Sequence, residues 1–120
     1  MAERADEHLL YTDKQLVIRR TVAPAGLSVS GVLDSFNVDA FAQTLKTSLE
    51  GVGDVNIDLE YLEFCDVSGI RALVSAAKDV GDGRRLVLLG LPDQLRNVMT
   101  LVGWNDLPGL VIIGGRDADQ

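Results

Sequence analysis

The sequence of 120 residues contains a single cysteine, Cys65, and a single histidine, His8. One cysteine excludes an internal disulfide and fits a reducing compartment. With one histidine in a polar N-terminal stretch, the chain has neither a base for a serine-histidine-aspartate triad nor a cysteine-histidine zinc cluster. It also lacks a Walker motif and the three-glycine fingerprint of dinucleotide-binding proteins. We therefore expect a protein that is not an enzyme and holds no metal and no cofactor.

Basic residues, aromatic residues and long apolar runs are also scarce. There are 11 Lys and Arg against 18 Asp and Glu, giving a net charge of −7, and aromatic residues make up 5% of the chain. Nucleic-acid binding normally needs a basic face or a stacking platform, so this composition disfavours it. No apolar run approaches the roughly 20 residues of a membrane span, and no secretory signal precedes the domain. The composition predicts a cytoplasmic protein whose acidic charge suits solubility or a partner with a basic patch.

The 47% of hydrophobic residues is sufficient for one globular domain, and their periodicity indicates its elements. Two strands joined by a turn at Pro24 and Gly26 form an opening hairpin. Strands and helices then alternate, which requires crossover connections and a largely parallel sheet. We predict an α/β fold with a mixed sheet of four or five strands, opened by the hairpin and covered by three or more helices. Residues 1–12 are expected to be a flexible tail, 13–115 the domain and 116–120 a second tail.

The most informative stretch runs from residue 56 to residue 78. A buried strand with alternating apolar residues is followed by a loop over 61–66, in which Leu62 and Phe64 are expected to be apolar plugs. The sequence Asp66-Val67-Ser68-Gly69 then opens a helix, because the apolar residues after it recur at helical spacing. These apolar residues are Ile70, Leu73, Val74 and Ala77. A polar turn between a strand and a helix is where α/β folds usually carry their function.

These motifs resemble the signature of the STAS domain family, typified by bacterial anti-sigma-factor antagonists. The family pattern of a strand ending in Asp, a loop and Asp-x-Ser/Thr-Gly before an apolar residue appears as Asp58 and 66–70. A second family element, Gly-x-Leu/Ile-Asp, appears as residues 31–34. The resemblance extends from about residue 16 to residue 113. It implies the STAS fold and a protein that binds an anti-sigma factor with serine kinase activity and thereby releases a sigma factor. It also implies that a phosphate on Ser68 abolishes this binding and that a phosphatase restores it.

Each candidate residue also has a structural explanation. Ser68 is either the phosphorylation site or a helix cap, and Asp66 competes for the capping role, in which case the Ser68 hydroxyl is free to face solvent. Asp34 is a turn residue or part of the partner surface, and Gly69 provides close helix packing. Three polar residues of the same helix lie outside its apolar stripe, and they either face solvent or contribute to docking a partner protein; these are Arg71, Ser75 and Lys78. The predicted partner-binding residues are Gly31, Asp34, Asp66, Val67, Ser68, Gly69, Arg71 and Ser75.

One position departs from the family pattern. In the best-known antagonists the residue directly after the motif Asp is the phosphorylated serine, whereas this chain has Val67 there, with Ser68 one step later. One step along a helix turns a side chain by about 100°. This favours a first alternative, a STAS scaffold or transporter-associated module that is never phosphorylated. A second alternative is a module that binds a nucleotide or another small ligand. The sequence leaves the oligomeric state open.

Overall fold

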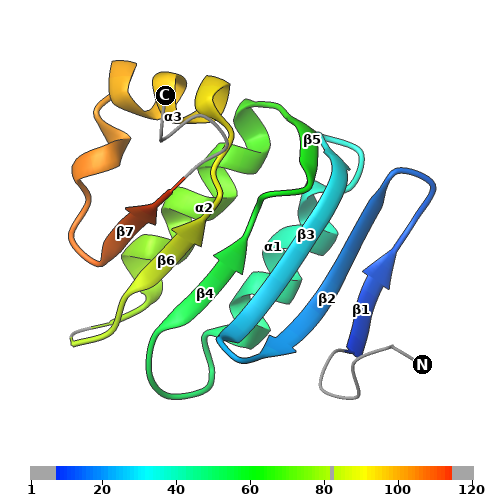
Figure 1. The fold of residues 1–120 in the computed structure, drawn as a ribbon, viewed down its shortest axis with the longest axis horizontal. Helices are drawn as coiled ribbons and strands as arrows, with labels where there is room; N and C mark the ends of the chain where they lie inside the picture. Colours follow the sequence, from blue (N-terminus) through cyan, green and yellow to red (C-terminus); the bar gives the residue numbers. More distant parts are fainter. Residues whose placement is uncertain (1–7, 82, 115–120) are drawn as a thin grey trace.

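The computed structural model describes residues 8–81 and 83–114, which form one sheet and three α-helices (Figure 1). After the third strand, helices and strands alternate as the hydrophobic periodicity indicated, except that β4 and β5 follow one another without a helix between them. The strands are β1 (His8–Thr12), β2 (Leu16–Val22), β3 (Ala25–Leu33), β4 (Val55–Asp58), β5 (Leu62–Cys65), β6 (Leu86–Leu89) and β7 (Leu110–Ile113). The helices are α1 (Val38–Ser48), α2 (Val67–Asp79), α3 (Asp93–Leu101) and a short 3-10 helix, η1 (Trp104–Asp106).

The seven strands form a mixed sheet in the order β1-β2-β3-β4-β6-β7, with β5 pairing β3 beyond the end of β4. β1, β2 and β3 are antiparallel, whereas β3, β4, β6 and β7 are parallel to one another. The long strand β3 therefore pairs β4 along its first half and β5, also in parallel, along its second half. This arrangement brings the ends of β3 and β5 to the same edge of the sheet.

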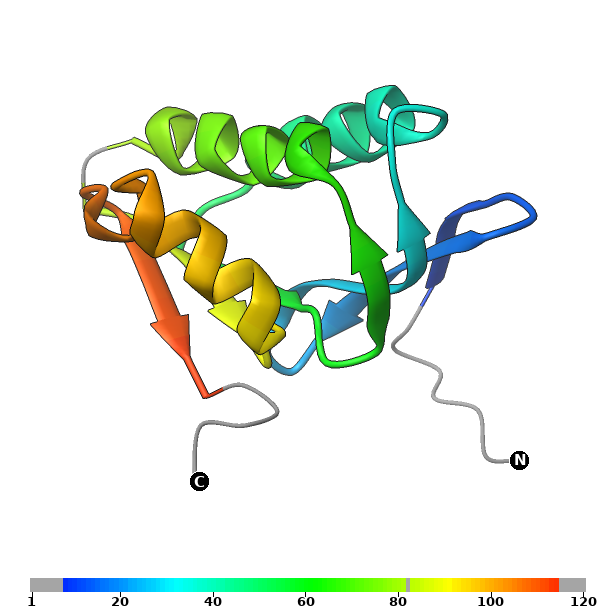
Figure 2. The same cartoon turned by 90° about the horizontal axis from the view of Figure 1, so that it is seen from above.

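Helices α1 and α2 lie side by side on one face of the sheet, and α3 lies beside them near β6 and β7 (Figure 2). The predicted apolar stripe of α2 is confirmed, because Ile70, Leu73, Val74 and Ala77 are all buried. These residues pack in one core with the inward side chains of the central strands and with Phe41 of α1. Leu95 and Met99 of α3 are also buried, whereas Val102 is exposed after the helix has ended.

The predicted α/β class with a mixed sheet is confirmed, but the sheet has more strands than the four or five expected. Residues 8–12, expected to belong to a tail, form β1, and the expected loop contains β5. β1 is nearly all exposed, so it carries no burial pattern that could have revealed it. β5 has only four residues, and the register between β3 and β5 is irregular, so Leu62 and Cys65 are buried while Glu63 and Phe64 are exposed. An irregular pairing of this kind removes the simple alternation that identifies a strand.

Candidate functional site

The candidate site begins at the turn between β5 and α2, where Asp66 caps the helix. Its Oδ1 atom accepts a hydrogen bond from the Gly69 backbone N–H at 3.2 Å, and its backbone adopts the extended conformation of a capping residue. The same Oδ1 accepts a hydrogen bond from the Ser68 hydroxyl at 2.5 Å. Asp66 is therefore the cap. The expectation that the Ser68 hydroxyl would then be free is wrong, because the capping carboxylate itself binds it.

The hydrogen bonds to Asp66 also set its charge. The Ser68 hydroxyl, and then the backbone N–H groups of Gly69, Ser68 and Ser35, hold the pKa of the Asp66 carboxyl below its usual value against a smaller opposing effect of burial. Asp66 is therefore ionised at neutral pH. Its contribution to stability is fully present above the pKa of the unfolded chain, about 3.9, and is lost as the pH falls through the lower folded value.

An Asp66→Ala variant is expected to be about 1 kcal/mol less stable than the unmodified chain at pH 7, because the N-cap of α2 is lost. At pH 3 or below the difference should shrink, since the carboxyl of the unmodified chain then becomes protonated. Urea unfolding of both proteins at the two pH values measures this change. A difference that stays constant with pH would show that the charged carboxylate is not what stabilises the turn.

The turn after β3 lies directly against this cap. The Asp66 backbone N–H donates to the Leu33 carbonyl at 3.1 Å, and the Ser35 N–H approaches the Asp66 carboxylate. Asp34 is a turn residue, since its Oδ1 accepts from the Phe36 N–H at 3.0 Å. The buried side chain of Asn37 fixes the turn by accepting from the Asp34 N–H. The two motifs singled out in the sequence, 31–34 and 66–69, therefore meet at one edge of the sheet.

The two glycines of these motifs serve the fold. A Cβ atom on Gly69 would lie 2.4 Å from the Cys65 Sγ atom and 2.8 Å from a methyl carbon of Leu33, so glycine allows α2 to approach β3 and β5 closely. Gly69 is buried, which contradicts its prediction as a partner contact and confirms its packing role. Gly31 has φ +100°, and a Cβ atom on it would lie 2.0 Å from the Gln15 carbonyl oxygen. Burial raises the pKa of the neighbouring Cys65 thiol to about 12, so the thiol stays protonated and unreactive at neutral pH.

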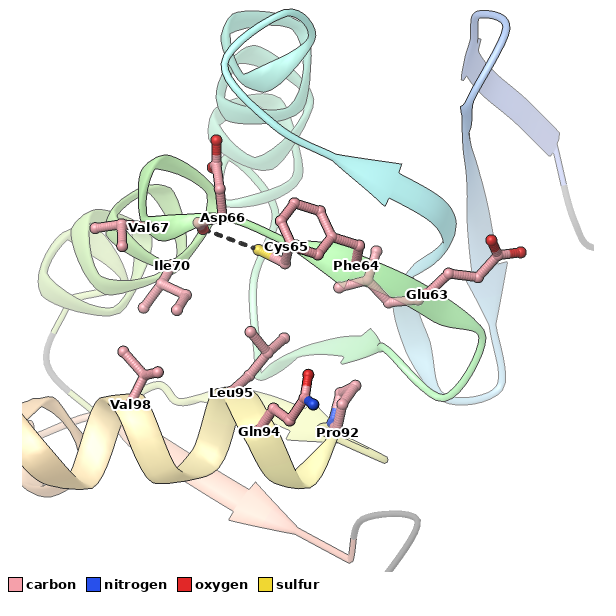
Figure 3. A pocket seen from close by; sticks show the side chains of 11 residues that line it. Glu63, Phe64, Cys65, Asp66, Val67, Ile70, Pro92, Gln94, Leu95 and Val98 are labelled. Carbon is pink, nitrogen blue, oxygen red and sulfur yellow. Dashed lines mark hydrogen bonds between the residues drawn. The ribbon is translucent and has the colours of Figure 1, made fainter.

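Two hollows flank the first turn of α2, and we name them by the helices that border them. The α2–α3 cavity, of about 300 Å³, lies between the start of α2, β5 and α3. Figure 3 shows Ile70 of α2 pointing toward Leu95 and Val98 of α3, while the carboxylate of Asp66 points away from them. Among the described residues, no lysine or arginine lines this cavity, which is mainly apolar.

The α1–α2 groove, of about 340 Å³, lies on the other side of the helix and is more polar. Val67 lines the α2–α3 cavity, whereas Ser68 lines the groove, because successive helical residues differ by about 100° in direction. Arg71 and Ser75, both exposed, also line the groove, so the structure brings them together with Ser68. Lys78 is exposed but lines a different hollow near the end of α2, and therefore lies apart from the other candidates.

Two aromatic residues that the sequence did not mark as functional are exposed beside the cap. Phe36 is 78% exposed in the turn after β3, and Phe64 is 54% exposed on β5. Of the two apolar plugs expected in this segment, Leu62 is confirmed because it is buried, whereas Phe64 is exposed and the expectation for it is wrong. With the half-exposed Val67, these side chains form what we call the apolar patch. An apolar surface that remains in water commonly marks an interaction site.

Neither a metal site nor a membrane-spanning helix is found among the described residues. Residues 8–81 and 83–114 contain no group of three His, Cys, Asp or Glu side chains arranged to hold a metal ion. Within the same residues, no helix combines the length and hydrophobicity that crossing a lipid bilayer requires. The exposed apolar patch and the two hollows around the capped helix are thus the features that point to binding.

A mixed sheet covered by helices, with a capped Asp-x-Ser-Gly turn between β5 and α2, defines a STAS domain. The family model for the Mlab STAS domain matches residues 16–112, and the chain belongs to the STAS domain family. No curated protein sequence matches it.

Solved structures at low identity share the fold. The anti-sigma factor antagonist SpoIIAA in its unphosphorylated form superposes with a TM-score of 0.59 at 16% identity, covering 94% of this chain and 92% of that one. An anti-sigma factor antagonist from Mycobacterium paratuberculosis gives 0.64 at 19% identity, with 91% and 89% covered. The chain also covers 21% of the murine Solute Carrier 26 family member A9 anion transporter, with 92% of this chain aligned, a TM-score of 0.61 and 15% identity. The fold is thus shared by antagonists and by part of a transporter.

Proposed function

We propose that this chain is an anti-sigma-factor antagonist. It binds an anti-sigma factor that is also a serine kinase, in the cytoplasm, and so releases a sigma factor for transcription. The observation that carries the proposal is the apolar patch of Phe36, Phe64 and Val67 around the capped start of α2. The fold shared with two antagonist structures supports the same function. No step of this function requires the chain to act as an enzyme or to hold a cofactor.

The chemistry of the patch indicates what the partner presents. The α2–α3 cavity beside Val67 has the size and apolar lining to accept one large apolar side chain, and anchors of this kind dominate binding energy at interfaces. Carboxylates of Asp34, Glu63 and Asp66 lie near the patch, and the whole chain has a net charge of −7. We therefore expect a partner surface with an apolar anchor surrounded by basic residues, which would also accelerate association.

Phosphorylation of Ser68 would switch this binding off. A phosphate adds a charge of about −1.5 to −2 and a large hydration shell to a surface that the partner must desolvate. At Ser68 it would also lie next to the ionised Asp66. A phosphatase would reverse the change. Ser68 is exposed enough for this role, since it is only partly buried in the first turn of α2.

The switch is tested by intact-mass analysis of the chain isolated from its native cells, alongside a Ser68→Ala variant. We expect a fraction of the unmodified chain to carry one phosphoryl group and the variant to carry none. A Ser75→Ala variant is the matched control, because Ser75 is a more exposed serine on the same helix, and it should keep the phosphoryl group. If no phosphorylated form appears under any growth condition, the kinase switch is wrong.

A binding module that is never phosphorylated is the second candidate. Two observations favour it: Val67 occupies the position of the usual phosphoserine, and the Ser68 hydroxyl is engaged by Asp66 at 2.5 Å. The fold is also shared with part of an anion transporter. A complex that forms equally well with and without ATP would support this function. The third candidate, nucleotide binding, is disfavoured at the α2–α3 cavity because no described basic residue lines it, and a thermal shift with nucleotides tests it cheaply.

A further inference from the structure

We propose that the α1–α2 groove is a phosphate receptor in which Arg71 and Lys46 hold a phosphoryl group carried by Ser68. The inference rests on the proposed function in that it takes Ser68 as the modified residue. It adds where the phosphate goes after transfer and which side chains receive it. The phosphoryl group is assigned to the groove and not to the α2–α3 cavity, because Ser68 lines the groove whereas Val67 lines the cavity.

The cationic side chains come from both helices that border the groove. Arg71 follows Ser68 by three residues on α2, so the two side chains lie on the same face of the helix, one turn apart. Lys46 reaches the groove from α1. Neither cation has a hydrogen-bond or ion-pair partner among the residues that the structure describes. Two cationic side chains in the walls of the groove that Ser68 lines can receive a phosphate carried by that residue, since each can form a charge-assisted hydrogen bond with its oxygens.

Two acidic residues bear on the phosphate: Asp66 accepts the hydrogen bond of the Ser68 hydroxyl, and Asp79 lines the groove. In the transfer step, the Ser68 Oγ atom attacks the γ-phosphorus of a nucleoside triphosphate, the bond to the bridging β–γ oxygen breaks, and the nucleoside diphosphate leaves. The serine proton passes to Asp66 Oδ1, which already accepts its hydrogen bond, and then to water. The hydrogen bond to Asp66 is thereby lost, and the two negative groups repel each other. Asp79, at the far end of the groove, is eleven residues from Ser68, about 16 Å along the helix, and does not compete.

The location of the phosphate determines what it can regulate. A phosphate held between Arg71 and Lys46 joins α1 to α2 and neutralises two cations of the groove. It lies on the opposite side of the first helical turn from the cavity beside Val67. The proposed switch therefore requires that the partner anchored in the cavity also covers the groove, where the phosphate displaces it.

The test uses the full chain with phosphoserine placed at position 68 by genetic encoding, so that no kinase is needed. A phosphorus NMR titration gives the second pKa of the phosphate, which is about 6 for free phosphoserine. We expect this pKa to rise by about 0.5 in Arg71→Gln or Lys46→Gln and by about 1 in the double variant, because each removed cation had favoured the dianion. An Arg19→Gln variant is the control, since Arg19 is an exposed arginine on β2 that does not line the groove.

A second pKa that is the same in the double variant and the Arg19→Gln control would overturn the proposal. Lys46 and Arg71 are exposed, so their replacement leaves the core intact, and urea unfolding of each variant verifies this. The outcome is independent of the intact-mass experiment. A chain never phosphorylated in its cells would disprove the kinase switch even if the groove binds the encoded phosphate. An unchanged pKa would disprove the receptor even if Ser68 is phosphorylated in the cell.

Discussion

A Val67→Asp variant is expected to lose about 30- to 1,000-fold in affinity for the anti-sigma factor while remaining as stable as the unmodified chain. Val67 is half-exposed beside the α2–α3 cavity, where a partner's apolar anchor would have to desolvate the new carboxylate. A desolvation cost of about 2–4 kcal/mol in the binding free energy corresponds to this loss of affinity. Stability should not fall, because an acidic residue in the first turn of a helix interacts favourably with the helix dipole.

The matched control is Val52→Asp, the same chemical change on the most exposed large apolar residue. Val52 is 97% exposed in the loop between α1 and β4, at the end of the sheet opposite the start of α2. We expect this variant to bind as the unmodified chain does. Isothermal titration with the partner, together with urea unfolding of all three proteins, separates affinity from stability. An affinity of Val67→Asp equal to that of Val52→Asp would place the interface elsewhere.

A Gly31→Ala variant is expected to be destabilised by more than about 3 kcal/mol, or not to fold. Its Cβ atom would lie 2.0 Å from the Gln15 carbonyl oxygen. That oxygen accepts a hydrogen bond from the Val32 N–H at 2.7 Å, so the two backbone segments cannot separate without disturbing the pairing of β2 and β3. The φ angle of +100° adds strain for any residue with a side chain. Gly31 therefore has a structural role, which urea unfolding measures, and its role as a partner contact stays a prediction.

Gly53→Ala is the control for this variant. Gly53 also has a positive φ, +84°, but a Cβ atom there would meet no other atom within 4 Å. Only the backbone strain remains, so we expect a cost of about 1 kcal/mol. Equal destabilisation of the two variants would mean that the close approach of Gly31 to β2 is not what requires glycine at that position.

The sequence predicted those parts of the molecule that depend on local pattern. The helical spacing of Ile70, Leu73, Val74 and Ala77 identified α2, and the alternation of strands and helices predicted a largely parallel sheet covered by helices. The capping chemistry of Asp66 was also predictable, because a carboxylate before a helix binds its first N–H groups. Strands β1 and β5 were missed, since an exposed edge strand and a short, irregularly paired strand have no clean alternation.

The surroundings of the site depend on tertiary packing and were not accessible from one sequence. The apolar lining of the cavity beside Val67 is supplied partly by Leu95 and Val98, which lie far along the chain on α3. The exposure of Phe64 follows from the irregular pairing of β5 with β3. The sequence did show that replacing the usual serine by Val67 turns the hydroxyl by about 100°. Only the arrangement of the three helices shows that this turn moves the hydroxyl from one hollow to another.

The most direct test of the central claim is affinity purification of the tagged chain from its native cells, with the Val67→Asp and Val52→Asp variants in parallel. Mass spectrometry would identify the retained proteins. We expect the unmodified chain and Val52→Asp to retain one anti-sigma factor that carries a kinase domain, and Val67→Asp to lose it. Retention of that protein by all three chains, or the recovery of a membrane transporter in its place, would contradict the proposed function.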